Sequence, residues 1–408
     1  MEKHILDQID PKTLGTRLQE ARKARGFTQQ AVADQMKMAR TTLVAIEKGE
    51  RRVLPQELIQ LAALYGRPVS EFVSRQIVTV GFVPQFRSEW RDDINEDGEL
   101  EHTAAELQRL AEDYAELERL CELPPSKTYP LVYETSRSAP EQAAEEIAAA
   151  ERNRLGIGDG PVSNLRERLE TDVGLRVFYF VMPPKVSGVF AYNDVLGGCV
   201  GINANHPRDR RNWSLAHEYG HFLTNRYRAE ITFLNERKRQ SASERFADSF
   251  AENFLMPGSG LNRRFTEMHR LSESGQITLA QICTLADLYQ VSVQALVIRL
   301  EKLRRLPTGT WDKLEAEGFK PRRAQQLLGI DANPVEKYLL PRRYLNLAVM
   351  AYDKALLSEG QLARFLRSDR VSARVLVEEV SRRFNAEAPD EEGYESFELD
   401  LAQPLAGR

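Results

Sequence analysis

The sequence predicts an α+β protein that is mostly α, with one small antiparallel sheet in the middle of the chain. Apolar residues recur at helical spacing within residues 13–74 and again from residue 258 to about residue 384. Between these segments, residues 173–181 alternate as a half-buried strand does, and two short glycine-bounded strands are expected at 188–193 and 199–203. The length of 408 residues fits two to three domains.

The first 75 residues predict five short helices. Thr28 is a suitable N-cap for the second helix, and Gly49 is the residue type expected just after the third. A tight turn between these two helices is typical of a helix-turn-helix domain. The dipeptide Thr28-Gln29 and the segments 46–51 and 61–65 resemble the XRE/Cro-type repressor family, which implies double-stranded operator DNA as a partner. The other expected helices lie at 13–25, about 39–48, 55–65 and 69–74.

The charge distribution agrees with DNA binding. Residues 12–75 hold 12 Lys plus Arg against 6 Asp plus Glu, so this segment is about +6 in a chain of net charge −4. Ala39 stands where a capping Ser or Thr is common, so the start of the third helix is expected to fray. The basic surface could instead serve a protein contact or be only a solvated face. We expect Gln29, Arg40, Thr41 and Thr42 to face bases in the major groove, and Lys48, Arg51 and Arg52 to lie near phosphates.

A connector follows, with an acidic loop at 91–101 and a long helix at about 102–122 that ends before two prolines. The apolar positions of this helix form a heptad seam of only two repeats, whereas a coiled coil needs three or four. Packing within the chain is therefore favoured. A dimer seam is the alternative, because helix-turn-helix proteins usually bind two half-sites as symmetric pairs, and we expect a homodimer. The seam consists of Leu107, Leu110, Tyr114, Leu117 and Cys121.

Two histidines flank a glutamate in His217-Glu218-Tyr219-Gly220-His221, inside a run at 212–223 that predicts a helix. Residues four apart lie on one helix face, so both imidazoles can reach a single metal ion. Glu218 lies beside them, where it can take a proton from a metal-bound water. The alternative is a surface or core helix that only happens to carry two histidines. A third ligand from a separate helix would favour the metal interpretation.

A candidate third ligand lies 23 residues after His221, in a predicted helix that ends before Pro257. Glu244 and Asp248 share one face of this helix. Glu244 would complete a two-His-one-Glu set, and Asp248 is suited to orient one histidine through its other ring nitrogen. Alternatively, both acids are only the solvated edge of an amphipathic helix.

The segments 213–221 and 244–257 resemble the ImmA/IrrE family of zinc metallopeptidases, and the similarity extends over about residues 140–305. The resemblance implies a zincin-like domain in which one Zn²⁺ per chain is held by His217, His221 and Glu244, with Glu218 as the general base. One departure is Asp248, where the family commonly has Asn. The two helices expected at 277–300 resemble the part that follows the ligand helix in this family, and we expect them to be a packing element.

No stretch approaches 18 apolar residues, the N-terminus has no signal-peptide core, and three widely spaced Cys give no disulfide framework. A cytoplasmic protein of bacterial or phage origin is expected. The expected organisation is a helix-turn-helix domain at 1–75, a connector at 76–139, a metallopeptidase domain at 140–305, a helical region at 306–384 and an acidic, mobile tail at 385–408.

The leading hypothesis is therefore a DNA-binding transcriptional regulator with a zinc-dependent endopeptidase domain. By resemblance, such peptidases cut regulatory proteins in stress responses, so the substrate would be a partner repressor or the chain itself. An exposed edge strand near the metal would hold the extended substrate. The alternative is a regulator whose metal site senses a signal without proteolysis. A fourth protein ligand such as Asp248 would favour this alternative, and an open position would favour the enzyme.

Overall fold

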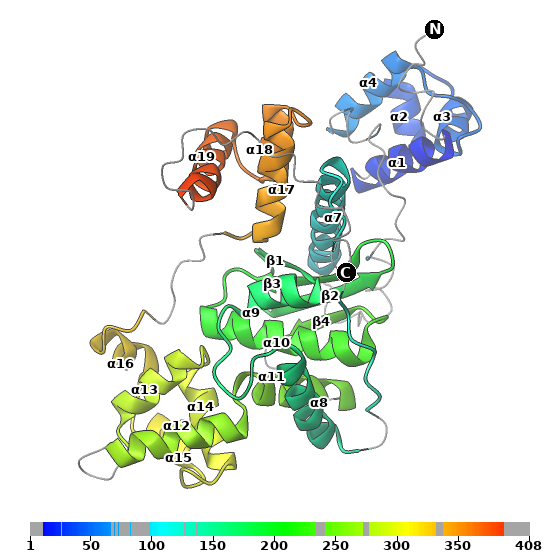
Figure 1. Cartoon of the computed structure of the whole chain (residues 1–408). Coiled ribbons are helices and arrows are strands. Elements are labelled where there is room, and N and C mark those ends of the chain that lie inside the picture. Colours follow the sequence, from blue (N-terminus) through cyan, green and yellow to red (C-terminus); the bar gives the residue numbers. More distant parts are fainter. Residues whose placement is uncertain are drawn as a thin grey trace, which may run out of the picture. The chain divides into compact units, whose positions relative to one another are not determined.

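The computed structural model describes residues 11–66 except residue 26, residues 98–125, 128–135, 138–233, 241–271, 277–331 and 338–386, and the single residues Val69, Phe72 and Phe82. It divides into two compact units, Met1–Thr79 and Val80–Arg408 (Figure 1). Most of the expected fifth helix, most of the acidic loop and nearly all of the acidic tail lie outside the described residues. The mostly helical α+β class is confirmed.

The first unit packs four described helices around one apolar core. Thr28 caps the second of them, because its hydroxyl accepts a hydrogen bond from the backbone N–H of Ala31 at 3.1 Å. Ala39 provides no side-chain cap, as expected, and Gly49 ends the third helix with a φ of +72°. A Cβ at Gly49 would lie 2.6 Å from the backbone of Lys12, so only glycine fits there. The helices are α1 (Pro11–Ala24), α2 (Gln29–Gln35), α3 (Arg40–Glu47) and α4 (Pro55–Tyr65).

The second unit contains a four-stranded sheet in the order β1-β3-β2-β4. The expectation of an antiparallel sheet is wrong for one strand pair, because β1 runs parallel to β3. β1 and β2 are not neighbours, because β3 lies between them in the sheet. β3 is antiparallel to β2 and therefore runs in the same direction as β1. Buried Asn203 holds the connection from β1 to β2, since its Nδ2 donates to the carbonyl oxygens of Met182, Pro183 and Val186. The strands are β1 (Arg176–Phe180), β2 (Val186–Asn193), β3 (Gly197–Asn203) and β4 (Glu230–Phe233).

Side chains of the sheet alternate between two apolar cores, one on each face. Val177 and Val200 belong to the core that contains α10 and α11, whereas Phe178 and Cys199 belong to the core that contains α7. On the first face the layers follow as sheet, α10, α11 and α8 (Figure 1). The sequence did not predict β4 or α8. The helices of this half are α8 (Pro140–Arg154), α9 (Leu165–Arg168), the π-helix η2 (Leu169–Val173), α10 (Arg208–Asn225) and α11 (Ala242–Leu255).

The long connector helix α7 (Glu99–Leu120) lies on the other face of the sheet, beside α17. All five residues of its heptad seam are buried within this chain, so the expected intramolecular packing is confirmed and the seam does not serve a dimer. The helices that complete this core are α17 (Arg342–Asp353), α18 (Glu359–Phe365) and α19 (Arg370–Ala386).

The five helices that follow α11 extend the core that contains α10 and α11. The expected packing role of the pair α13 and α14 agrees with their buried residues, which include Ile282, Leu285, Leu296 and Leu300. Within the described residues no single helix has the length and apolar character of a membrane span, and this pair has them only when its two helices, bent by 101°, are combined. The helices are α12 (Gly258–Leu271), α13 (Leu279–Leu288), α14 (Val293–Lys302), α15 (Thr310–Ala316) and α16 (Pro321–Leu327).

Candidate metal centre

Helix α10 brings His217 and His221 together, as the spacing of four residues predicts. Both imidazoles are almost fully buried, their ring centroids lie 4.8 Å apart, and the two Nε2 atoms are separated by 3.0 Å. The close approach of α11 depends on Gly220, where a Cβ would lie only 3.3 Å from the Cα of Ala247. The helix tolerates this glycine because it lets the two helices pack tightly beside the histidines.

Helix α11 adds Glu244 to the pair. Glu244 Oε2 lies 3.4 Å from His217 Nε2, and Glu244 Oε1 lies 3.4 Å from His221 Nε2. One ligand atom from each of the three residues lies within 4.8 Å of the other two. The position of Glu244 follows from the start of its helix, since Ser241 caps α11 by accepting a hydrogen bond from the Glu244 N–H at 3.1 Å.

Nδ1 of each imidazole, the nitrogen on the side away from Glu244, lies close to a side-chain oxygen. His217 Nδ1 lies 2.9 Å from the Asp248 carboxylate, and His221 Nδ1 lies 3.3 Å from the hydroxyl of Ser243, which also accepts from Asn225 at 2.9 Å. Protons on both Nδ1 atoms leave lone pairs on both Nε2 atoms, and those lone pairs face each other. A cation between them removes this repulsion, so the donor set fits a zinc ion.

The electrostatics of the cluster also favour a cation. Burial alone would lower the pKa of His217, but hydrogen bonds to Asp248 and Glu244 and the charge of Glu218 raise it to about 10. Burial would raise the pKa of Glu244, but the two histidines hold it well below its usual range. The carboxylates of Asp248, Glu244 and Glu218 thus favour the protonated form of His217 when no other cation is present. A ligating imidazole is neutral, so a bound metal ion replaces that proton.

Glu218 is fully buried beside the histidines and is fixed from the sheet side. Thr232 on β4 donates its hydroxyl hydrogen to Glu218 Oε1 at 2.6 Å. Gly188 on β2 leaves room for the same carboxylate, because a Cβ there would lie 2.6 Å from Oε1. The edge strand β4 and the candidate base are therefore directly connected.

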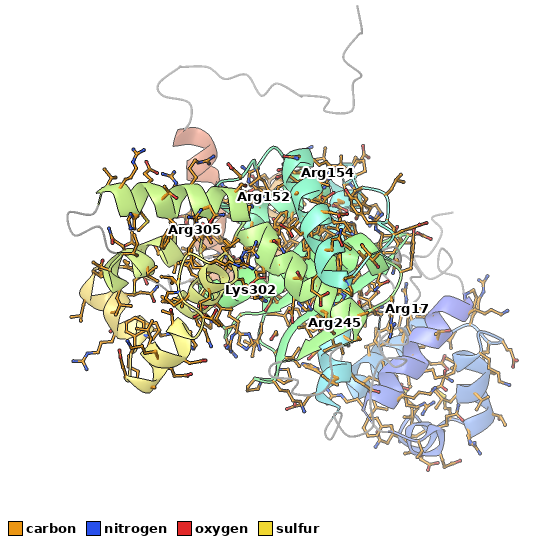
Figure 2. All side chains as sticks on the ribbon, turned by 90° about the horizontal axis from the view of Figure 1, so that it is seen from below. Arg17, Arg152, Arg154, Arg245, Lys302 and Arg305 are labelled. Carbon is orange, nitrogen blue, oxygen red and sulfur yellow. The ribbon has the colours of Figure 1, made fainter. Side chains whose placement is uncertain are left out.

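A buried polar network supports α10 from the opposite side. Tyr219, between the two histidines in sequence, donates to Glu151 on α8, and Arg154 binds the same carboxylate at 2.8 Å and the Tyr219 oxygen at 3.0 Å. Figure 2 labels Arg154. Tyr133 donates to the other oxygen of Glu151 at 2.8 Å. No spacing pattern in the sequence predicts this network, since its residues come from three separate segments of the chain.

The structure places the other site candidates as follows. Asp248 contacts Nδ1 of His217 from outside the cluster, and its orienting role stays a prediction. Ser243, Thr232 and Asn225 were not predicted, because hydroxyl and amide side chains carry no spacing pattern.

The DNA candidates divide into exposed and engaged side chains. Arg40 and Thr41 on α3, and Lys48 and Arg52 after it, are exposed, and Thr42 is half-buried. Two candidates are held within the domain. Gln29 donates its amide to Glu47 at 2.8 Å, and Arg51 forms a paired contact with Glu57 at 2.9 and 3.0 Å. Glu47 is itself buried against Arg22, with a closest N···O distance of 2.6 Å, so this network fixes α3 against α1.

Comparison with known proteins matches two family profiles to separate parts of the chain. The profile described as the IrrE N-terminal-like domain of the M78 peptidases matches residues 170–301, and a helix-turn-helix profile matches residues 18–72. The first match spans all three candidate metal ligands, and the second spans α2, α3 and α4. A search of curated proteins found no significant match.

Several solved structures align over most of the chain at low identity. They are ComR from Streptococcus suis (8% identity, 93% of this chain and 96% of that chain, TM-score 0.16), Bacillus thuringiensis PlcR in complex with the peptide PapR7 and DNA (10%, 92%, 95%, 0.17), and the apo form of the competence regulator ComR from Streptococcus vestibularis (11%, 93%, 99%, 0.16). TM-scores this low carry no argument about fold or function. The family matches do, and they establish that this chain joins an XRE-type helix-turn-helix domain to an IrrE N-terminal-like domain of the M78 peptidase family.

Proposed function

We propose that this protein is a DNA-binding transcriptional regulator whose second unit is a zinc-dependent endopeptidase. The observation that carries the proposal is the convergence of His217, His221 and Glu244 on one point, with buried Glu218 beside them and the edge strand β4 next to Glu218. His217, His221 and Glu244 would hold one Zn²⁺, and Glu218 would be the general base. When bound, zinc supplies a Lewis acid that acidifies water and polarises a peptide carbonyl.

The chain's own residues have distinct tasks in this proposal. Glu218 takes the proton from the attacking water and delivers it to the leaving amine. Thr232 holds one oxygen of that carboxylate in place, while Asp248 and Ser243 orient the two imidazoles through Nδ1. Because β4 is the last strand in the sheet order, its outer edge can pair with an extended substrate and lay the peptide beside Glu218.

The position of Asp248 favours the enzyme over a closed sensor site. Its carboxylate binds Nδ1 of His217, which is the ring nitrogen that points away from the cluster. A fourth protein ligand would have to face the Nε2 atoms instead. Among the described residues, only His217, His221 and Glu244 form such a ligand group, so the proposed coordination would leave one position for water and substrate, as catalytic zinc sites do.

The helix-turn-helix domain suggests both partners of this enzyme. Operator DNA would bind at α3 and next to it, with Arg40, Thr41 and Thr42 of α3 and Gln29 of α2 toward bases, and Lys48, Arg51 and Arg52 after α3 toward phosphates. Binding two half-sites would require a homodimer. The peptide substrate would be a regulatory protein in the same cytoplasm, either a partner repressor or a second copy of this chain, cut in response to stress.

The decisive experiment is cleavage by the zinc-loaded full chain and by its Glu218→Gln variant. Each is incubated with purified XRE-type repressors and alone, and fragments are identified by mass spectrometry. Fragments should form with the wild type and the control Glu145→Gln, an exposed residue on α8, but not with Glu218→Gln. Equal cleavage by all three proteins would refute the assigned mechanism. Absence of fragments, together with metal-dependent DNA affinity, would establish the sensor instead.

A further inference from the structure

A second candidate site lies away from the metal centre, in a cavity of about 440 Å³ bounded by α10, the α13–α14 turn, α15 and α16. This volume is within the roughly 300–1,000 Å³ of typical small-molecule sites. Arg208 of α10 contributes to its wall and precedes His217 by nine residues, which is a rise of about 13.5 Å along the helix. The cavity is therefore distinct from the metal cluster.

The interior of the cavity is apolar, with one buried polar donor. Val291, Val293, Phe319 and Trp311 provide aliphatic and aromatic surface. The indole nitrogen of Trp311 is buried and has no hydrogen-bond partner among the residues that the structure describes. Buried polar groups are normally hydrogen-bonded, so an unpartnered N–H in a cavity wall indicates a ligand that supplies the missing acceptor.

The rim of the cavity offers both signs of charge. Lys320 and Arg322 are exposed cations, and Asp209 and Glu315 are carboxylates at partly or fully exposed positions. None of these four has an ion-pair partner among the residues that the structure describes. A multiply anionic ligand such as a nucleoside triphosphate would meet repulsion from the two carboxylates. A molecule with one anionic and one cationic group would find a partner for each.

The wall is fixed to the metal-bearing helix. Arg208 forms an ion pair with Asp287, and Asn212 donates its amide to Gln290 at 3.0 Å, so the α13–α14 turn is tied to the first turns of α10. These contacts keep the cavity preformed. A preformed site lowers the entropy cost of binding a small molecule.

We propose that this cavity binds a small zwitterion with an apolar body, namely a hydrophobic amino acid or dipeptide. The carboxylate lies toward Lys320 and Arg322, the ammonium group lies toward Asp209 and Glu315, and the apolar side chain packs against Trp311 and Phe319. A carbonyl or carboxylate oxygen of the ligand accepts a hydrogen bond from Trp311 Nε1.

The test is titration calorimetry with leucine, phenylalanine and the dipeptides of Leu, Ile, Phe, Tyr and Trp. The protein is the full chain carrying Glu218→Gln, so that no dipeptide is hydrolysed. At least one zwitterion should bind with 1:1 stoichiometry, and N-acetylation or C-terminal amidation of that probe should weaken its binding at least 10-fold.

Matched variants assign the binding to the cavity. Arg322→Glu and Trp311→Phe, which removes the indole N–H, should each weaken the affinity at least 10-fold, whereas Arg323→Glu, an exposed neighbour on α16 outside the cavity lining, should leave it unchanged. Thermal unfolding followed by circular dichroism shows whether each variant is folded, and Arg322→Ala replaces Arg322→Glu if the latter is not. Lack of binding across the panel, equal binding by Arg322 and Arg323 variants, or preferential binding of adenosine triphosphate would overturn the proposal.

Discussion

Gly188→Ala tests whether the sheet positions Glu218. The added Cβ would lie 2.6 Å from Glu218 Oε1, which is 0.8 Å closer than the 3.4 Å at which ordinary contact begins. Overpacking of this kind costs about 1–3 kcal/mol. Replacing glycine within a strand recovers about 0.5–1 kcal/mol of backbone entropy. The net loss of unfolding free energy in the second unit should therefore lie between roughly 0 and 2.5 kcal/mol, with a central value of about 1 kcal/mol.

The same displacement should slow peptide cleavage more than it weakens metal binding. A catalytic group misplaced by about 1 Å costs roughly 100-fold in rate, so a shift near 0.8 Å should cost about 30- to 100-fold. The three atoms nearest the new methyl group all belong to Glu218, so zinc affinity should change less than about 3-fold.

Three assays check these values. Urea unfolding followed by tryptophan fluorescence reports on the second unit alone, because all three tryptophans lie beyond residue 79. Cleavage rate and competition with a zinc chelator complete the set. Gly160→Ala is the control, since a Cβ there meets nothing within 4 Å. Wild-type stability and cleavage in Gly188→Ala would refute the positioning argument, as would an equal loss in the control.

Four further predictions follow from other parts of the structure. Asp248→Ala should weaken zinc affinity about 10- to 100-fold in chelator competition, whereas Asp248→Asn should retain most of it, because an amide oxygen can still accept from Nδ1; equal losses would contradict the orienting role. Glu47→Ala should destabilise the first unit by about 3–5 kcal/mol in circular dichroism, because it leaves a buried arginine without its partner; a change below about 1 kcal/mol would contradict this. Burial raises the pKa of Asp113 to about 6, against the attraction of its arginine partners. Between about pH 4 and pH 6 the folded chain therefore holds a proton that the unfolded chain has released, so the unfolding free energy of the second unit should fall by up to about 3 kcal/mol as the pH rises through this range. This fall should be absent in Asp113→Asn. Arg40→Ala should relax operator preference by about 1–3 kcal/mol per affected base pair, while Lys48→Ala should weaken all sequences alike and reduce the salt dependence of binding; unchanged DNA affinity in both variants would remove the proposed interface.

Much of the candidate site could be predicted because its central residues lie on two amphipathic helices. The spacing of four within α10 places both histidines on one face regardless of the tertiary fold. Glu244 could be identified because the apolar pattern around it predicts a helix with that residue on its first turn. Resemblance to a known family then connected the two motifs, and the structure brings them together.

The surroundings of the site could not be predicted, because they depend on contacts between distant segments. Thr232 lies on a strand of four residues, which is too short for a clear alternating pattern. Glu151 is one acid among many on α8, and only the tertiary fold shows that Tyr219 and Arg154 bury it. The parallel pairing of β1 with β3 has the same origin, because the sequence predicts strands but not the order in which they pair.

The interpretation of Gln29 also needed the fold. Its place after an N-cap predicts a base-contacting residue, but its amide is donated to Glu47, so a contact with DNA requires either the carbonyl oxygen or a rearrangement of that hydrogen bond. Arg51 likewise meets phosphate only in competition with Glu57. Both candidates remain predictions, and the exposed Arg40 and Lys48 are the better first targets.

X-ray absorption at the zinc edge of the zinc-loaded full chain tests the metal centre most directly. The spectrum should show two imidazole nitrogens at about 2.0–2.1 Å, one carboxylate oxygen at about 2.0–2.2 Å and one exchangeable light ligand. His217→Ala should remove one imidazole from that shell. A sulfur ligand at about 2.3 Å, a shell closed by four protein ligands, or a spectrum unchanged in His217→Ala would contradict the proposed metal centre.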